Sequence, residues 1–123
     1  MEEFDKLIEL LKLDRKESEW GRSFTMESSL KELKSEVEEI EEALKNNDIQ
    51  NLKEEIGDSL GDLLFLAIIA EEKGLFSIKD SLKSMHERMK RRKPWLLKGE
   101  KVSKEEEQKI WDEIKRKERE TNS

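Results

Sequence analysis

Apolar side chains recur through this chain at intervals of three and four residues, the spacing of an amphipathic helix. The clearest series is Leu30, Leu33, Val37, Ile40 and Leu44, a heptad-like seam suited to packing against another helix. One proline and five glycines in 123 residues leave few places where a helix would break. No alternating run of β-branched residues predicts a strand. The pattern therefore predicts an all-α fold, a helical bundle of about five helices joined by short turns.

Five segments carry this spacing, and polar or helix-breaking residues separate them. We expect helices over residues 3–13, 26–46, 49–73, 78–92 and 103–118. Residues 14–25 interrupt the pattern and predict an ordered loop, with Ser23 or Thr25 capping the helix that follows. Gly74 and Pro94 predict the ends of the third and fourth helices.

The apolar residues are few, 33% of the chain, whereas 46% of the residues are charged. A small chain with so little apolar material often completes its core by pairing with a copy of itself. The segment Leu60–Ala70 is apolar around most of its circumference, which is typical of a helix buried on more than one side. We therefore expect a homodimer or homotetramer assembled through the second half of the helix over residues 49–73.

Composition also excludes several classes of protein. The net charge of −6 argues against a nucleic-acid polymer as partner, because proteins that bind nucleic acids carry basic surfaces. The longest apolar run, residues 63–70, is far shorter than the ~20 residues of a membrane span. The acidic first residues lack the basic start of a secretory signal. The absence of cysteine fits a reducing compartment, so we expect a cytoplasmic protein that is not membrane-bound.

Two pairs of acidic residues stand at unusual places. Glu36 and Glu39 are three apart on the helix over residues 26–46, beside its apolar seam, and Glu55 and Asp58 repeat that spacing on the next helix. A short turn joins these helices, so they should pack antiparallel and bring the two pairs together. Clustered carboxylates repel one another unless a cation neutralises them. Oxygen ligands suit Mg²⁺, with Mn²⁺ as a substitute, and Mg²⁺ bound in this way points to phosphate chemistry.

Asp62 lies one turn beyond Asp58, inside an apolar run where an unpaired charge is costly. It is either a further metal ligand or the partner of a basic residue from another helix, such as Arg88 or Arg92. The alternative for all of these acids is ordinary solvated helix surface, because Glu-x-x-Glu recurs by chance in a chain so rich in glutamate.

The order and spacing of these motifs resemble those of the MazG nucleotide pyrophosphohydrolases, within the all-α NTP pyrophosphatase superfamily. The family pattern is E-E-x-x-E followed by E-x-x-D, and the matching stretches here are Ser35-Glu-Val-Glu-Glu39 and Glu55-Ile-Gly-Asp58. The resemblance continues through Gly74-Leu-Phe76 and Arg91-Arg-Lys-Pro-Trp95, where the family has Arg-Arg-His-Pro-His. Upstream, Trp20 falls at the tryptophan of the family's Cys-Pro-Trp-Asp segment. One copy of the module covers nearly the whole chain.

Two departures accompany this resemblance. Ser35 stands where the family has its first glutamate, so one expected carboxylate is missing. The family's Gly-Asp-Leu-Leu-Phe string is matched in part twice, from Gly57 and from Gly61. The spacing to the flanking motifs assigns Asp58 as the ligand, and it leaves Asp62 as an additional ligand or as a replacement for what Ser35 lacks.

The resemblance implies a single domain over residues 1–123, with a core motif region over 26–95 and a closing helix over 103–118. It also implies Mg²⁺-dependent hydrolysis of a nucleoside triphosphate between its α and β phosphates, giving a nucleoside monophosphate and pyrophosphate, with nucleotide-pool cleansing as one role. The catalytic residues, which also hold the metal, would be Glu36, Glu39, Glu55 and Asp58, and Asp62 would be a further ligand.

Substrate contacts are expected from basic and aromatic side chains. Arg88 and Arg92, four apart on one helix, could reach the β and γ phosphates, and the alternative is an ordinary basic helix end. Trp20, Phe24 and Trp111 could stack on a base, and the alternative for each is packing. Two rival functions remain open: a sister pyrophosphatase specific for dCTP, dUTP or phosphoribosyl-ATP, and a helical interaction module without catalysis.

Overall fold

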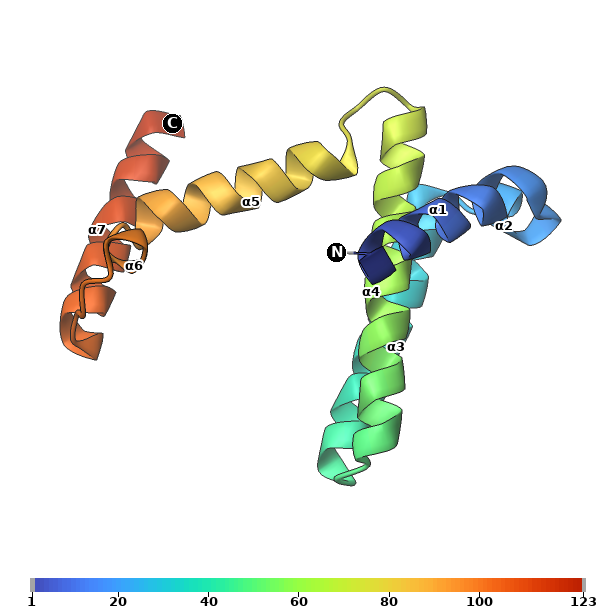
Figure 1. The fold of residues 1–123 in the computed structure, drawn as a ribbon, viewed down its shortest axis with the longest axis horizontal. Helices are drawn as coiled ribbons and strands as arrows, with labels where there is room; N and C mark the ends of the chain where they lie inside the picture. Colours follow the sequence, from blue (N-terminus) through green and yellow to red (C-terminus); the bar gives the residue numbers. More distant parts are fainter. Residues whose placement is uncertain (1, 123) are drawn as a thin grey trace. The chain divides into compact units, whose positions relative to one another are not determined.

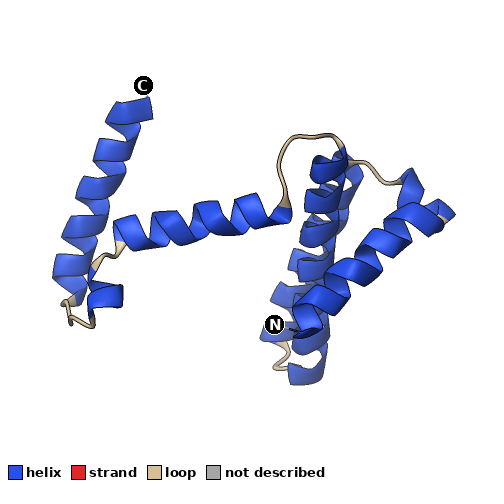
Figure 2. Cartoon of the chain, turned by 45° about the horizontal axis from the view of Figure 1, so that its top comes forward, coloured by secondary structure: helices blue, strands red, loops and turns tan. Residues whose placement is uncertain are grey.

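A computed structural model describes residues 2–122, and every regular element in that range is a helix (Figures 1 and 2). The predicted all-α fold is therefore confirmed. The helices are α1 (Glu2–Glu17), α2 (Glu19–Ser23), α3 (Met26–Lys45), α4 (Ile49–Glu72), α5 (Ile78–Arg92), α6 (Trp95–Lys98) and α7 (Lys104–Asn122). They form two compact units, the first ending at Ile78 and the second beginning at Lys79. That residues 1–123 act as a single domain stays a prediction.

The first unit is built on an antiparallel hairpin of α3 and α4, which make the most extensive contact between elements among the described residues. Thr25 caps α3 through a reciprocal hydrogen-bond pair with Ser28, as its position before the apolar seam predicted. Asp48 caps α4 by accepting a hydrogen bond of 3.1 Å from the Asn51 amide. Gly74, with φ at +73°, follows the end of α4 as predicted.

Helix α1 lies across α4 and supplies the apolar contacts that its spacing predicted. Buried Leu64 and Ile68 of α4, together with Ile78, form the centre of this core. The residues packed around them are Phe4, Leu7, Ile8, Leu11 and Ala67. Much of the apolar half of α4 is thus buried within the unit itself rather than left for another subunit.

The prediction of a loop over residues 14–25 was wrong for most of that segment. Helix α1 continues to Glu17, and the short helix α2 follows it directly. Ser18 caps α2 by accepting a hydrogen bond of 3.1 Å from the Gly21 amide. The polar residues of this segment had suggested a loop, but contacts with distant parts of the chain hold them in helical form.

The second unit contains most of α5 together with α6 and α7. Glu118 of α7 accepts hydrogen bonds from Arg91 and Arg92 of α5, each with a shortest distance of 2.8 Å. Ser103 caps α7 by accepting from the Glu106 amide at 3.2 Å. Two short helices, α2 and α6, raise the number of helices in the described range above the five that were expected.

None of the described helices is both long enough and apolar enough to cross a membrane. The prediction of a cytoplasmic location stays a prediction.

Candidate functional site

The α3–α4 hairpin brings three of the predicted carboxylates together. Glu36 and Glu39 of α3 and Glu55 of α4 each offer a carboxylate oxygen, and these oxygens all lie within 4.8 Å of one another. Glu55 is buried, Glu36 is half-buried and Glu39 is exposed, so the cluster extends from the helix interface to the solvent. The i, i+3 spacing on each helix and the short turn between the helices account for this convergence.

Two oxygens of this cluster are buried without a hydrogen-bond partner among the described residues, Glu36 Oε2 and Glu55 Oε2. A buried carboxylate oxygen with no donor is costly unless a cation or a proton satisfies it. The donor set contains only oxygen, which is the set that hard divalent cations prefer. The residues present therefore fit a divalent metal ion.

The pKa values of all three clustered carboxyl groups are raised. For Glu55 the side-chain hydrogen bond with Glu36 raises the pKa most, and burial adds to the shift. For Glu39 the hydrogen bond with Glu55 and the charge of Glu55 raise the pKa most. For Glu36 the hydrogen bond with Glu55 lowers the pKa, but burial and the neighbouring negative charges outweigh it. Three acids that resist ionisation together are typical of a site built to be neutralised by a cation.

Asp58 and Asp62 lie near this cluster, but their carboxylates are not among the three whose oxygens lie within 4.8 Å of one another. The charge of Asp58 contributes to the raised pKa values of Glu36, Glu39 and Glu55, which places it within electrostatic reach of all three. Burial is the main cause that raises the pKa of Asp62, followed by repulsion from Glu32 and Asp58.

No ion pair joins Asp62 to a basic side chain within residues 2–122. Within the first unit the charged groups that act on Asp62 are Glu32 and Asp58, both acidic. Arg88 and Arg92, the basic partners considered from the sequence, belong to the second unit, so that alternative stays a prediction.

A cavity of about 390 Å³ opens beside the carboxylates. Its acidic wall includes Glu36, Asp58 and Asp62, and its aromatic wall consists of Trp20, Phe24 and Phe65. The remaining lining residues are Leu7, Leu11, Asp14, Gly21, Gly57 and Gly61. A cavity lined by both carboxylates and aromatic rings can accept a ligand that has an anionic part and a flat ring.

The aromatic wall is a connected series of rings. The Trp20 and Phe24 rings have centroids 5.8 Å apart, and Phe24 meets Phe65 edge to face at 5.7 Å. Trp20 is 72% exposed, so a face of its indole is open to a ligand. Phe65 had no role in the sequence-based prediction, although it lies seven residues after Asp58 and three after Asp62, on the same side of α4. That spacing was the available signal.

The other predicted substrate residues, Arg88, Arg92 and Trp111, belong to the second unit. Arg92 is engaged there: it donates to Glu118, and its guanidinium lies 5.0 Å from the centroid of the Trp111 ring. The hydrogen bond with Glu118 raises the pKa of Arg92. Arg88 donates to the Ser84 hydroxyl of its own helix at 3.0 Å. Contact of these three residues with a substrate stays a prediction.

Taken together, the fold and the site define an all-α protein with a carboxylate cluster on a helical hairpin, which fits a divalent metal ion, and an aromatic-lined cavity beside it. Comparison with known proteins agrees with that class. Residues 24–97 match the model of the MazG nucleotide pyrophosphohydrolase domain. The chain belongs to the MazG nucleotide pyrophosphohydrolase family.

Individual relatives show how much of each protein the chain represents. It is 38% identical over 93 residues to the nucleoside triphosphate pyrophosphohydrolase/pyrophosphatase MazG of Thermotoga maritima, covering 74% of this chain and 36% of that protein. It is 35% identical over 104 residues to the uncharacterized protein YabN of Bacillus subtilis, covering 84% of this chain and 21% of YabN. The chain thus spans less than half the length of the curated relatives that it matches.

A solved structure matches over most of this chain and nearly all of its own length. The crystal structure of a MazG-related protein from Thermotoga maritima is 38% identical, with a TM-score of 0.85, and the match covers 91% of this chain and 98% of that one.

Proposed function

We propose that this chain is a metal-dependent nucleoside triphosphate pyrophosphohydrolase that converts a triphosphate and water to a nucleoside monophosphate and pyrophosphate. The observation that carries the proposal is the cluster of Glu36, Glu39 and Glu55, whose oxygens lie within 4.8 Å of one another beside an aromatic-lined cavity. Membership of the MazG family supports the reaction class, and the names of the relatives point to the same substrates.

In this proposal Glu36, Glu39 and Glu55 hold Mg²⁺, with Mn²⁺ as a substitute, and Asp58 and Asp62 complete the acidic surround. Bound Mg²⁺ supplies positive charge that offsets the charge gathering on the leaving pyrophosphate. The two buried oxygens without partners, Glu36 Oε2 and Glu55 Oε2, support metal binding in preference to a solvated acidic surface.

The protein's own part in the reaction is to place the substrate and to accept a proton. A water molecule attacks the α phosphorus, the bond from that phosphorus to the bridging oxygen breaks, and pyrophosphate leaves. A carboxylate at the cluster accepts the proton from the attacking water, and Glu36 and Glu39 are the candidates.

The aromatic wall would bind the base of the nucleotide. Trp20 is largely exposed, Phe24 is in contact with its ring, and Phe65 is in contact with that of Phe24. Stacking tolerates any base, so this wall favours nucleotides as a class rather than one base. Basic side chains predicted from the sequence, Arg88 and Arg92, would contact the phosphates.

We also propose that the chain forms a homo-oligomer. Half-exposed apolar residues follow α3 and α4 at intervals of seven, which is the spacing of a helix–helix contact. They are Leu30, Val37 and Leu44 on α3, and Ile49, Ile56 and Leu63 on α4. Because Leu64, Ile68 and Ile69 are already buried within the chain, these two stripes, rather than the whole apolar half of α4, are the surface that a second copy would cover.

Pyrophosphate release tests the proposed reaction. The protein is assayed with each common ribo- and deoxyribonucleoside triphosphate, including dCTP and dUTP, and with phosphoribosyl-ATP, with Mg²⁺ and with excess chelator. We expect equal amounts of monophosphate and pyrophosphate, released only with the metal. Turnover of one substrate alone would favour a sister specificity, and no turnover of any would favour a helical interaction module.

A further inference from the structure

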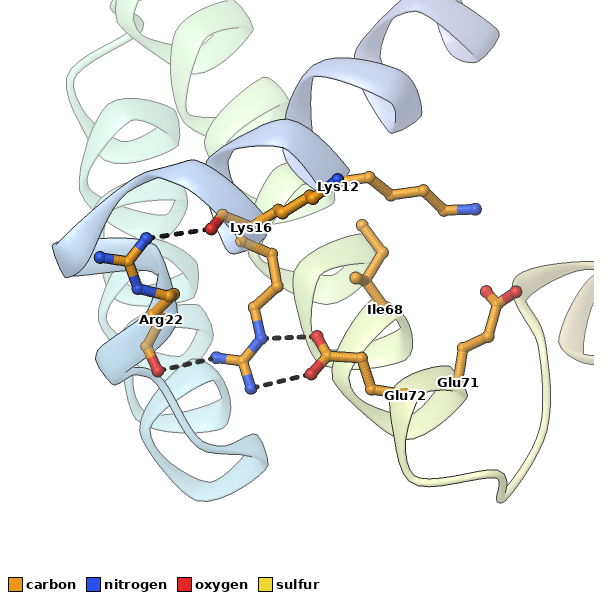
Figure 3. Close-up of a pocket in the computed structure, with 7 residues that line it drawn as sticks. Lys12, Lys16, Arg22, Ile68, Glu71 and Glu72 are labelled. Atoms are coloured by element: carbon orange, nitrogen blue, oxygen red, sulfur yellow. Dashed lines mark hydrogen bonds and ion pairs between the residues drawn. The ribbon is translucent and has the colours of Figure 1, made fainter.

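Arg15 makes an unusual number of contacts for a residue near the end of a helix. Its side chain is 18% exposed and forms an ion pair with Glu72 of α4, with a shortest distance of 2.6 Å. The same guanidinium donates to the backbone carbonyls of Gly21, Arg22 and Phe24 at 2.9, 3.2 and 2.8 Å. Dashed lines in Figure 3 mark the bonds to Glu72 and to the Arg22 carbonyl. A single side chain thus ties α1, the end of α2 and the end of α4 together.

The three carbonyls lie at the end of α2 and just after it, where the Gly21 carbonyl also accepts a hydrogen bond of 3.4 Å from the Phe24 amide. Helix α2 ends at Ser23, and the last carbonyls of any helix lack intrahelical donors. Arg15 supplies those donors from α1, and a charged donor makes such hydrogen bonds stronger than neutral ones.

Gly21 brings α2 against α1 at the same point. A Cβ atom on this residue would lie 2.3 Å from the Asp14 carbonyl oxygen and 3.2 Å from the Arg15 Cα. Only glycine permits this approach of backbone to backbone. The corner between α1 and α2 is therefore fixed twice, by the absence of a side chain at Gly21 and by the contacts of Arg15.

This corner carries the aromatic wall of the cavity. Trp20 lies within α2, and Phe24 directly follows α2 as its C-cap residue, with its backbone N–H donating to the Gly21 carbonyl. The carbonyl of Phe24 is the acceptor of the shortest bond from Arg15 to the backbone. The ring of Phe24 is in turn in contact with those of Trp20 and Phe65.

We propose that Arg15 is a positioning residue for substrate binding: it holds the α1–α2 corner so that Trp20 and Phe24 line the same cavity as the carboxylates of Glu36, Asp58 and Asp62. This inference rests on the proposed function and extends it. Arg15 does not line that cavity and would touch neither substrate nor metal. Substituting Arg15 should weaken binding of the base and leave metal binding intact, because α3 and α4 alone supply the carboxylate cluster.

The test separates base binding from phosphate binding. Pyrophosphate release gives kcat and KM for a nucleoside triphosphate, and inorganic triphosphate, which has no base, is added as a competitive inhibitor. In Arg15→Lys the charge remains but a single ammonium cannot reach all the acceptors. We expect KM to rise about tenfold, as loss of base–aromatic stacking would produce. Both kcat and the inhibition constant of triphosphate should stay within about twofold of wild type.

Two further variants sharpen this result. Trp20→Ala alone should also raise KM and leave kcat unchanged. In the double variant, Arg15→Lys should raise KM no further, because both substitutions weaken the same aromatic contact with the base. Lys16→Gln, a change at the exposed neighbouring position of α1, is the matched control and should leave KM unchanged.

Each outcome decides the matter. Wild-type KM in a folded Arg15→Lys protein, or an equal loss of affinity for triphosphate, would overturn the inference and leave the proposed function standing. Absence of turnover in the wild-type protein would overturn both. If Arg15→Lys does not fold, Glu72→Gln, which removes only the partner's charge, should still raise KM with kcat retained. Loss of helical circular dichroism in both variants would show a folding requirement instead and would also overturn the inference.

Discussion

Glu36 on α3 and Glu55 on α4 lie in one group of carboxylates within 4.8 Å, and each has an Oε2 atom buried without a partner among the described residues. Two acids from adjacent helices do not remain this close as bare charges without cost. A bound cation would offset the repulsion between these carboxylates. The free energy of unfolding should therefore increase when the ion is added.

Adding Mg²⁺ should raise the melting temperature of the wild-type protein, because an ion that binds only the folded state stabilises it. Na⁺ at equal ionic strength is the control for screening and should produce a smaller rise. Thermal unfolding followed by circular dichroism measures both. Equal shifts with the two ions would show that the cluster is only a screened acidic surface.

Asp62 should behave as part of this site rather than as the partner of a basic side chain. In Asp62→Asn, Mg²⁺ affinity should fall by about 10–100-fold, and the protein without metal should be as stable as wild type or more so, because repulsion from Glu32 and Asp58 is removed. Calorimetric titration and chemical unfolding measure the two quantities. Unchanged affinity with a loss of about 3–5 kcal/mol would instead reveal a broken buried ion pair.

Gly57 and Gly61 offer a test of the cavity. A Cβ atom at either position would meet no atom within 4 Å outside its own helix, so alanine fits there. Each Gly→Ala change should stabilise α4 by about 0.5–1 kcal/mol because alanine loses less backbone entropy in a helix. Both glycines line the cavity, so the same changes should raise KM for a nucleotide. Increased stability with KM unchanged would mean that the substrate lies elsewhere.

The contact between α5 and α7 in the second unit should weaken at low pH, because it includes the ion pairs of Glu118 with Arg91 and Arg92. Hydrogen bonds from Arg92 and then Arg91 lower the pKa of Glu118 from 4.5 to about 2. Since the folded-state pKa is the lower one, ionised Glu118 stabilises the pair above about pH 4.5, and this contribution is lost as the pH falls toward 2. The indole signal of Trp111, which lies against Arg92, should report the change by NMR. Glu118→Gln should abolish that transition, whereas Glu113→Gln, at an exposed ion pair of α7, should not.

Assembly can be tested at the exposed apolar stripes. Val37→Lys and Ile56→Lys place a charge where each wild-type side chain is about half exposed, 52% and 53%, so the single chain should still fold. We expect light scattering to give an oligomer for wild type and for the control Gln50→Lys, and a monomer for the two stripe variants. A wild-type protein that is monomeric at micromolar concentration would contradict the proposed homo-oligomer.

Most of the fold followed from local sequence patterns. Helices α3, α4 and α5 begin at the predicted residues because their caps and breakers, such as Thr25 and Gly74, are encoded next to them. The convergence of Glu36, Glu39 and Glu55 could be predicted as well, because it needs only i, i+3 spacing and a tight turn.

What could not be predicted depends on contacts between distant residues. Helix α2 exists because Arg15 satisfies its carbonyls and Gly21 lets it approach α1, and neither interaction has a local signature. The acid that binds Arg92 is Glu118, 26 residues downstream, and no local pattern pairs the two residues. Which face of α4 the helix α1 would cover was equally open, because that contact joins residues far apart in the sequence.

The most direct test of the account is pyrophosphate release by Glu55→Gln beside Glu38→Gln. Glu55 is the buried member of the cluster, and Glu38 is an exposed acid on α3 outside it. We predict that Glu55→Gln loses turnover by a hundredfold or more, about the cost of removing a key electrostatic group, while its helical circular dichroism is retained. Glu38→Gln should match wild type. Wild-type turnover in a folded Glu55→Gln protein would contradict the proposed metal site and the mechanism built on it.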